Sequence, residues 1–240
     1  MKIEYVHLDS VDSTNNWVKS HLPKLSSLTC VTAQEQTAGR GRFKRNWVSP
    51  RGENIYATLY LTVPLGSNYL ANLGQIMAFA CAKVLRGIGF EAQLKWPNDI
   101  LIQGRKIAGV LTETVTQGEE IGVIIGIGIN VNMPTESLEA VGVPATSLLQ
   151  LSQKKWDLQE LTELLMNHFL QDLEVLKKSG FAPFQAPFEK MLAYKGQEIT
   201  CRDGTQTIKG ICHSLTSDGR LQLLMPSGEI KLLTAGELQL

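Results

Sequence analysis

Four basic side chains occur within six positions of one segment, Gly39-Arg40-Gly41-Arg42-Phe43-Lys44-Arg45-Asn46-Trp47. Guanidinium groups match phosphate or carboxylate oxygens two at a time, and the alternating glycines let successive backbone N–H groups converge on an anion. The segment is therefore suited to a small polyanion. The residues alone leave two other interpretations open: a merely solvated basic loop, or a loop that contacts nucleic-acid phosphates while Phe43 and Trp47 stack on bases.

A second segment, Lys95-Trp96-Pro97-Asn98-Asp99, brings a lysine, an amide and a carboxylate together at the end of a predicted strand. The proline fixes the turn and keeps Trp96 extended. Asp99 is suited to hold Mg²⁺ on a nucleotide, because this hard cation takes one or two carboxylates and fills its shell with phosphate oxygens. An isolated Pro-Asn-Asp is more often a plain turn, so the segment is ambiguous alone.

Two further segments combine a lysine or an amide with glycine. In the predicted strand over residues 106–113, Lys106 stands at the strand mouth and Gly109 leaves room for close approach. Gly126 and Gly128 lie two apart and bare one face of another predicted strand, against which a flat ligand would fit with Asn130 at its end. The alternative for Lys106 is an ordinary exposed lysine.

Several common chemistries are disfavoured. The sequence contains neither Gly-x-x-x-x-Gly-Lys-Ser/Thr nor Gly-x-Gly-x-x-Gly, and neither Gly-x-Ser-x-Gly nor His-Glu-x-x-His. The histidines all lie outside the four segments; they are His7, His21, His168 and His213. Histidine general-base or metal chemistry is therefore not expected.

Composition places limits on the class of protein. The chain has 240 residues, 43% of them hydrophobic, enough to bury one large core with at most a small satellite. Its 23 basic and 23 acidic residues balance, so no overall field steers it to nucleic acid or anionic membrane. Four scattered cysteines without a Cys-x-x-Cys pair indicate reduced, buried thiols. With no apolar signal core and no apolar stretch near the roughly 20 residues that span a bilayer, a soluble cytoplasmic protein is predicted.

The spacing of hydrophobic residues predicts the strands and helices that position these segments. It predicts strands over residues 3–8, 28–34, 55–63, 92–96, 106–113 and 121–131, of which 55–63 alternates clearly and is expected to be half-buried. Helices are predicted over 16–21, over 73–88, and from Asp157 to about residue 180. After Tyr194, short strands separated by Asp203-Gly204, Asp218-Gly219 and Ser227-Gly228 predict a small β-barrel behind a mixed α and β domain.

The four segments, in this order and after the lead-in over residues 9–15, resemble the biotin protein ligase family. The motifs are GRGRFKRNWVSPRGENIY, KWPND, KIAGVLTE and GIGIN, and the match covers essentially the whole chain. The resemblance implies an α+β fold: a mixed β-sheet flanked by helices in a catalytic domain of residues 1–190, followed by an SH3-like barrel of residues 195–240. It also implies an ATP- and Mg²⁺-dependent ligase that converts biotin to biotinyl-5′-AMP and transfers the biotinyl group to a lysine of a biotin carboxyl carrier protein.

The resemblance also implies a role for each motif residue. The implied biotin-binding residues are Ser13, Thr14, Asn15, Gln36, Gly39, Arg40, Gly41, Arg42, Lys106, Gly109, Gly126 and Gly128. The implied adenylate-binding residues are Arg42, Trp47, Asn98, Asp99, Lys106 and Asn130. Arg40, Arg42, Lys106 and Asp99 are the implied catalytic residues, with Asp99 also the implied Mg²⁺ ligand. Residues 133–146 are expected to form a lid over adenine, and no base for the acceptor lysine stands out beyond Asp99.

The sequence departs from the family pattern at Lys44, where the basic loop often has glycine, which makes the roles around Lys44 and Arg45 less secure. The motif begins by Asp9, so we expect a short form without the DNA-binding domain of some members, and no nucleic-acid or membrane partner. The oligomeric state stays open, a homodimer included. The rival functions are a lipoate or octanoate ligase or transferase, and a nucleic-acid-binding module whose DNA binding would persist in a salt titration.

Overall fold

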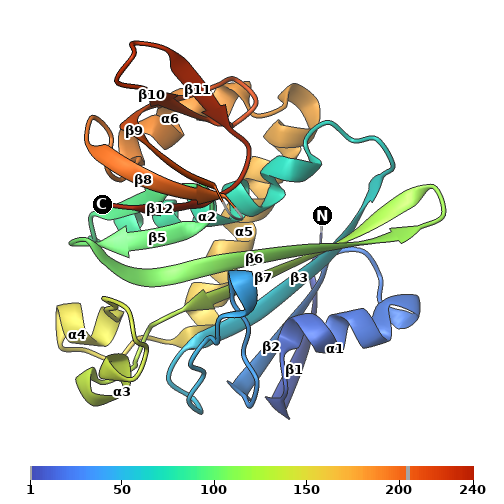
Figure 1. Cartoon of the computed structure of the whole chain (residues 1–240). Helices are drawn as coiled ribbons and strands as arrows, with labels where there is room; N and C mark the ends of the chain where they lie inside the picture. Colours follow the sequence, from blue (N-terminus) through green and yellow to red (C-terminus); the bar gives the residue numbers. More distant parts are fainter. Residues whose placement is uncertain (1, 204–205) are drawn as a thin grey trace.

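The computed structural model describes residues 2–203 and 206–240, apart from the side chains of Lys44 and Asp203. Its larger part is a seven-stranded sheet with strand order β1-β2-β3-β7-β6-β5-β4 (Figure 1). The strands are β1 (Glu4–Val11), β2 (Thr29–Gln36), β3 (Ile55–Pro64), β4 (Ala92–Lys95), β5 (Asp99–Ile102), β6 (Arg105–Gln117) and β7 (Glu120–Ile129). β1 and β2 are parallel and the other neighbours are antiparallel. The mixed sheet implied by the sequence is confirmed.

Helices cover both faces of this sheet. α2 (Leu73–Gly87) and α5 (Leu158–Ser179) pack together on one face, and α1 (Thr14–His21) lies on the other (Figure 1). Because side chains alternate along a strand, Leu59 joins the core under α2 while Tyr60 joins the smaller core under α1. The prediction that residues 55–63 are half-buried was wrong: α1 also buries the polar face, and Thr58 is 0% exposed.

Three helices and one strand were not predicted. β5 has only four residues, and α3 (Thr135–Glu139) and α4 (Leu148–Ser152) are single turns. α6 (Ala182–Met191) holds two prolines, which mask a helical pattern. The start of α5 was predicted correctly, because the Asp157 side chain accepts hydrogen bonds from the N–H groups of Gln159 and Glu160.

A second, antiparallel sheet follows α6 with strand order β11-β10-β9-β8-β12. Its strands are β8 (Glu198–Asp203), β9 (Gln206–Leu215), β10 (Leu221–Leu224), β11 (Ile230–Leu233) and β12 (Glu237–Gln239). Gly219 and Gly228 adopt the positive φ that their predicted turns require, whereas the Asp203-Gly204 turn lies partly outside the described residues. The described pairings do not join β11 to β12, so closure into a barrel stays a prediction.

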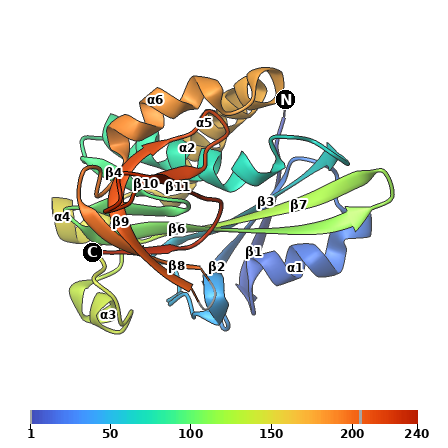
Figure 2. The same cartoon turned by 45° about the horizontal axis from the view of Figure 1, so that its top comes forward.

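The two sheets share one apolar core. Buried residues of the second sheet, such as Cys201 and Leu221, belong to the same cluster as α2 and β3, and Figure 2 shows this sheet lying beside α2 and α6. Gly219 anchors the contact, since its carbonyl accepts hydrogen bonds from Trp96 Nε1 at 3.0 Å and Gln75 Nε2 at 2.8 Å. The division at residues 190–195 therefore stays a prediction about domains, whereas the packing is continuous.

All four cysteines are free and buried, as predicted. Among the described residues, no helix combines the length and the apolar character needed to cross a bilayer.

Candidate active site

A cavity of about 570 Å³ opens where the start of α1, the basic loop (residues 39–47), β6, β7 and β12 meet. Fourteen of the residues implied by the motifs line it: Ser13, Thr14, Asn15, Gln36, Arg40, Gly41, Arg42, Trp47, Asn98, Asp99, Lys106, Gly109, Gly126 and Gly128. Segments separated by more than 100 residues thus converge on one site.

Two of the implied residues support the wall without lining it. A side chain at Gly39 would lie 2.4 Å from the Trp47 carbonyl oxygen, so only glycine fits at the base of the basic loop. Asn130 is 3% exposed, and its Nδ2 donates to the Thr146 carbonyl at 3.1 Å. Because Thr146 in turn bonds the carbonyl of Lys106, Asn130 fixes the wall behind that lysine. Its contact with an adenylate stays a prediction.

The basic loop closes on itself through backbone hydrogen bonds. Trp47 N donates to Gly39 O at 2.9 Å, and Gly41 N donates to Arg45 O at 2.7 Å. At the tip, Phe43 has φ 56° and is 56% exposed, a conformation uncommon outside glycine. This geometry fixes the ends of the loop and leaves its arginine side chains at the cavity.

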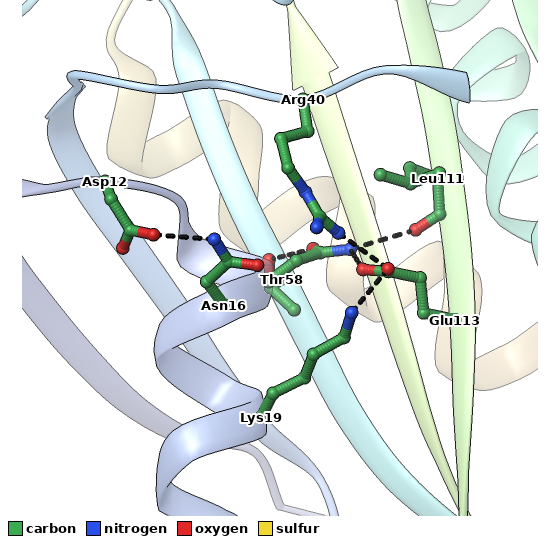
Figure 3. A network of polar contacts seen from close by, with 8 residues as sticks. Asp12, Asn16, Lys19, Arg40, Thr58, Leu111 and Glu113 are labelled. Carbon is green, nitrogen blue, oxygen red and sulfur yellow. Dashed lines mark hydrogen bonds and ion pairs between the residues drawn. The ribbon is translucent and has the colours of Figure 1, made fainter. Parts of the chain in front are cut away.

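One end of the cavity, here called the slot, is formed by Ser13, Thr14, Asn15 and Gln36. Thr14 Oγ1 lies 3.1 Å from Gln36 Oε1, and Thr58 Oγ1 lies 2.7 Å from both Thr14 Oγ1 and Asn15 Oδ1. Figure 3 shows Thr58 beneath the first turn of α1. Ser13, Thr14 and Asn15 are each 3% exposed. The slot is therefore lined by neutral polar groups, which suits a small uncharged polar ring.

The strand face at Gly126 and Gly128 was expected to be open to a ligand, but side chains of the protein cover part of it. A side chain at Gly126 would lie 2.2 Å from Asn15 Oδ1, and one at Gly128 would lie 2.3 Å from the indole of Trp47. Both glycines line the cavity, but their missing side chains make room first for the site's own Asn15 and Trp47. A direct ligand contact with this strand stays a prediction.

The opposite, charged end of the cavity, here called the anion end, holds its cations through ion pairs and hydrogen bonds. Lys106 Nζ lies 2.8 Å from Asp99 Oδ1, and Gly109 leaves space for this pair. Arg42 donates to Asn98 Oδ1 at 2.8 Å and to the Gly236 carbonyl at 3.2 Å. The basic loop, the KWPND turn and the second sheet therefore meet at Arg42.

The second sheet contributes residues that the motifs did not indicate. Glu237 accepts two hydrogen bonds from Arg45, at 2.5 and 2.6 Å, and these bonds lower the pKa of Glu237. Lys95 lies in the same region, where burial lowers its pKa. Thr58 and Glu113 were also missed as site residues. Thr58 carried a signal, as a hydroxyl between apolar neighbours in a strand, whereas Gly236 and Glu237 stand in no motif.

Among the described residues, five basic and two acidic side chains line the cavity: Arg40, Arg42, Arg45, Lys95, Lys106, Asp99 and Glu237. A neutral chain therefore concentrates positive charge at one place. Such a site offsets the repulsion between two anionic reactants held side by side. A neutral slot next to a basic anion end suits a ligand with a polar ring at one end and a carboxylate at the other.

The mixed sheet flanked by helices and the basic cavity agree with the protein family that the sequence matches. Residues 7–130 match the model of the biotin/lipoate A/B protein ligase family, and the chain belongs to this family.

Within this family, the chain is similar to several biotin protein ligases. The chain is 34% identical to the biotin–acetyl-CoA-carboxylase ligase of Paracoccus denitrificans, covering 92% of this chain and 94% of that one. It is 32% identical to the bifunctional ligase/repressor BirA of Escherichia coli, covering 97% and 73%. Among solved structures, the biotin protein ligase from Aquifex aeolicus in complex with biotin and ATP has a TM-score of 0.81, with 30% identity, 98% of this chain and 97% of that chain covered.

Proposed function

We propose that the protein is an ATP-dependent ligase that activates biotin to biotinyl-5′-AMP and transfers the biotinyl group to a lysine of a biotin carboxyl carrier protein or domain. The observation that carries this proposal is the junction of a neutral slot and a basic anion end within one cavity of about 570 Å³. Biotin has a neutral ureido ring at one end and a carboxylate at the other. The names of the relatives, including the complex with biotin and ATP, support the same assignment.

In the first step, a biotin carboxylate oxygen attacks the α-phosphorus of ATP, and the bond to the pyrophosphate leaving group breaks. Arg40, Arg42 and Lys106 reduce the repulsion between the two anions. Positioning and charge stabilisation supply most of the catalysis in such phosphorus chemistry. Arg42 has a second role, because it connects the basic loop to Asn98 and Gly236 and so holds together the walls of the anion end, where the adenylate would lie.

In the second step, the neutral amine of the acceptor lysine attacks the biotinyl carbonyl, AMP leaves, and the amine gives up a proton. Asp99 is the candidate to receive this proton, since it is one of two carboxylates in the described lining. Glu237 accepts two hydrogen bonds from Arg45, whereas Asp99 has one described ion pair, with Lys106. The four free, buried cysteines fit a reducing compartment, and we place the reaction in the cytoplasm.

Asp99 also fits Mg²⁺ that arrives with the nucleotide. Among the described residues, no group of three or more potential metal-ligating side chains is preformed. Mg²⁺ in nucleotide sites needs only one or two carboxylates, because phosphate oxygens and water complete its shell. Mg²⁺ would neutralise phosphate charge beside Lys106.

The decisive experiment measures pyrophosphate release from ATP and Mg²⁺ when biotin, lipoate or octanoate is supplied separately. We expect release with biotin alone, because the slot presents buried polar groups to the ring. Release only with lipoate or octanoate would assign the protein to the other branch of its family. Release with none of the three would overturn the proposed activity.

A further inference from the structure

A chain of polar side chains in hydrogen-bonding distance of one another runs beneath the slot. In order, it joins Glu113, Asn15, Thr58, Thr14, Gln36, Ser49 and the backbone carbonyl of Trp47. Thr58 and Ser49 are buried, with 0% and 9% exposure. Each hydroxyl has one proton to donate and each amide has one donating and one accepting end, so the direction of every bond depends on its neighbours.

The Glu113 end of the chain, drawn in Figure 3, has a fixed direction. Glu113 Oε2 accepts from Asn15 Nδ2 at 2.9 Å, while Oε1 accepts from Lys19 Nζ at 2.5 Å and from Arg40 at 2.6 Å. Burial opposes ionisation of Glu113, but these hydrogen bonds outweigh it and lower the pKa. An ionised carboxylate only accepts. The Asn15 amide must therefore turn its nitrogen toward Glu113 and its oxygen toward Thr58.

This orientation propagates toward the cavity. Asn15 Oδ1 has no proton, so Thr58 must use its single proton on that oxygen at 2.7 Å. Thr58 then has none left for Thr14, although their oxygens also lie 2.7 Å apart. The heavy-atom geometry alone would let Thr58 donate to Thr14 and Thr14 to Gln36, but Thr58 has one proton and Asn15 Oδ1 needs it. Thr14 must consequently donate to Thr58, and its 3.1 Å contact with Gln36 Oε1 then has no proton between the two oxygens.

At the Ser49 end of this chain of side chains, the hydrogen bonds leave Gln36 Oε1 as an acceptor facing Thr14. Ser49 Oγ donates to the Trp47 carbonyl at 2.9 Å and so accepts from Gln36 Nε2 at 3.0 Å. Gln36 Oε1 therefore faces Thr14, where it accepts the backbone N–H of Thr14 at 3.0 Å. Because a carbonyl oxygen has two lone pairs, Gln36 Oε1 keeps one for a ligand, and Thr14 Oγ1 keeps its own.

We propose that Glu113 is a positioning residue that determines specificity: its negative charge sets the direction of the chain, so that Thr14 and Gln36 present acceptors to a ligand with N–H donors. The cyclic urea of biotin carries two such donors, and the dithiolane ring of lipoate carries none. The inference rests on the proposed function and deepens it, because it names the group that makes the slot selective for a cyclic urea.

Substitution of Glu113 by glutamine tests the direction directly. The neutral amide can donate as well as accept, so among the described residues the only acceptor that still holds Asn15 Nδ2 in place is the Leu111 carbonyl at 3.4 Å. This long contact is weak enough for Asn15 to turn over. In the reversed chain Asn15 donates to Thr58, Thr58 donates to Thr14, and Thr14 donates to Gln36 Oε1. The acceptor capacity of Gln36 is then used up within the protein, and the slot offers less to ligand N–H groups.

The experiment measures the dissociation constants of biotin and of biotin methyl ester by titration calorimetry for the wild type, Glu113→Gln and Glu120→Gln. Glu120 is an exposed glutamate at the start of β7 and provides the matched control. We expect Glu113→Gln to weaken both ligands by about tenfold, the effect of one neutral hydrogen bond. Glu120→Gln should match the wild type, and the melting temperature should show that each variant is folded.

Thr58→Val interrupts the chain at its centre, and this residue does not contact Arg40. It is nearly isosteric, it frees Thr14 to donate to Gln36, and it should produce the same loss for both ligands. This variant decides the question if Glu113→Gln does not fold.

Unchanged affinity in both folded variants would overturn the inference. So would a loss for biotin that vanishes with the methyl ester, because Glu113 would then act through Arg40 on the ligand carboxylate. If the wild type binds neither ligand, it is the proposed function that fails, and the two failures are therefore distinguishable.

Discussion

The two ends of the cavity differ in how their polar groups are held. In the slot, Thr14 and Asn15 are each 3% exposed and are fixed by hydrogen bonds within the protein, to Thr58 and, for Asn15, also to the Glu113 carboxylate. At the anion end, Arg42 and Lys106 are held by Asn98, Gly236 and Asp99, partners drawn from distant segments. The slot is thus organised before a ligand arrives, whereas ligand oxyanions at the anion end must compete with existing partners. Selectivity and charge compensation are separated in space.

The strongest test of this separation is Lys106→Ala. We expect biotin-dependent ATP–pyrophosphate exchange to fall by about 100-fold or more, because one aimed cation at a developing charge contributes on that scale. The melting temperature should fall only slightly, since the lysine lies at the cavity surface and gives up one ion pair, with Asp99. Lys178→Ala, near the end of α5, is the control. Full activity of Lys106→Ala would show that the anion end has been assigned to the wrong residue.

Arg42→Gly should separate formation of the adenylate from its retention. The arginine joins the basic loop to Asn98 and to the Gly236 carbonyl, so its removal opens the cavity and should speed adenylate escape by about tenfold. The measurement is the fraction of labelled adenylate that stays with the protein through gel filtration. Arg51→Gly, outside the cavity lining, controls for loss of a surface arginine. Equal retention in both variants would contradict the role given to Arg42.

Glu237→Ala should affect one end of the cavity alone. We expect the KM for ATP to rise by about threefold and the dissociation constant of biotin to stay the same, since the partner Arg45 is 56% exposed and exposed ion pairs are weak. Steady-state kinetics and calorimetry on the same preparation provide both values. An equal change in biotin affinity would show that the second sheet also supports the slot. The slot and the anion end could then not be treated as separate parts of the cavity.

The smallest expected effect concerns stability against pH. The pKa of Glu113 is lowered below its ordinary value of 4.5, so its ion pairs stabilise the fold above that pH. This contribution is lost as pH falls through the folded-state value. Glu113→Gln should therefore show a shallower loss of melting temperature than the wild type below pH 4.5. Parallel curves for the two proteins would mean that the ion pairs of Glu113 with Lys19 and Arg40 add nothing to the stability of the fold.

The sequence predicted the residues that line the site better than the residues that hold them in place. Lys106 and Asp99 stand in motifs whose composition indicates chemistry, Thr14 was implied by the family resemblance, and all three meet in one cavity. Glu237 could not be predicted, because its role depends on tertiary contact with Arg45 across more than 190 residues of chain. The same limit explains why Asn130 was expected in the cavity: a glycine-rich strand end indicates a site but not which side its amide faces.

Elements were predicted where a pattern is local. The start of α5 follows from its Asp157 cap, and β3 follows from strict alternation. Burial of the polar face of β3 was missed, because alternation shows that two faces differ and not whether a helix covers the second. β5 and α6 escaped notice because the first is too short to show a period and the second contains Pro187.

The contact between Arg42 and Gly236 has a consequence for biosynthesis. Residues 13–36, which hold the slot, leave the ribosome well before residues 236–238, which line the anion end. Since synthesis proceeds from the N-terminus, this wall of the anion end can be completed only after every residue of the slot has already been made. The ability to retain an activated intermediate is then acquired last, when β12 is laid down.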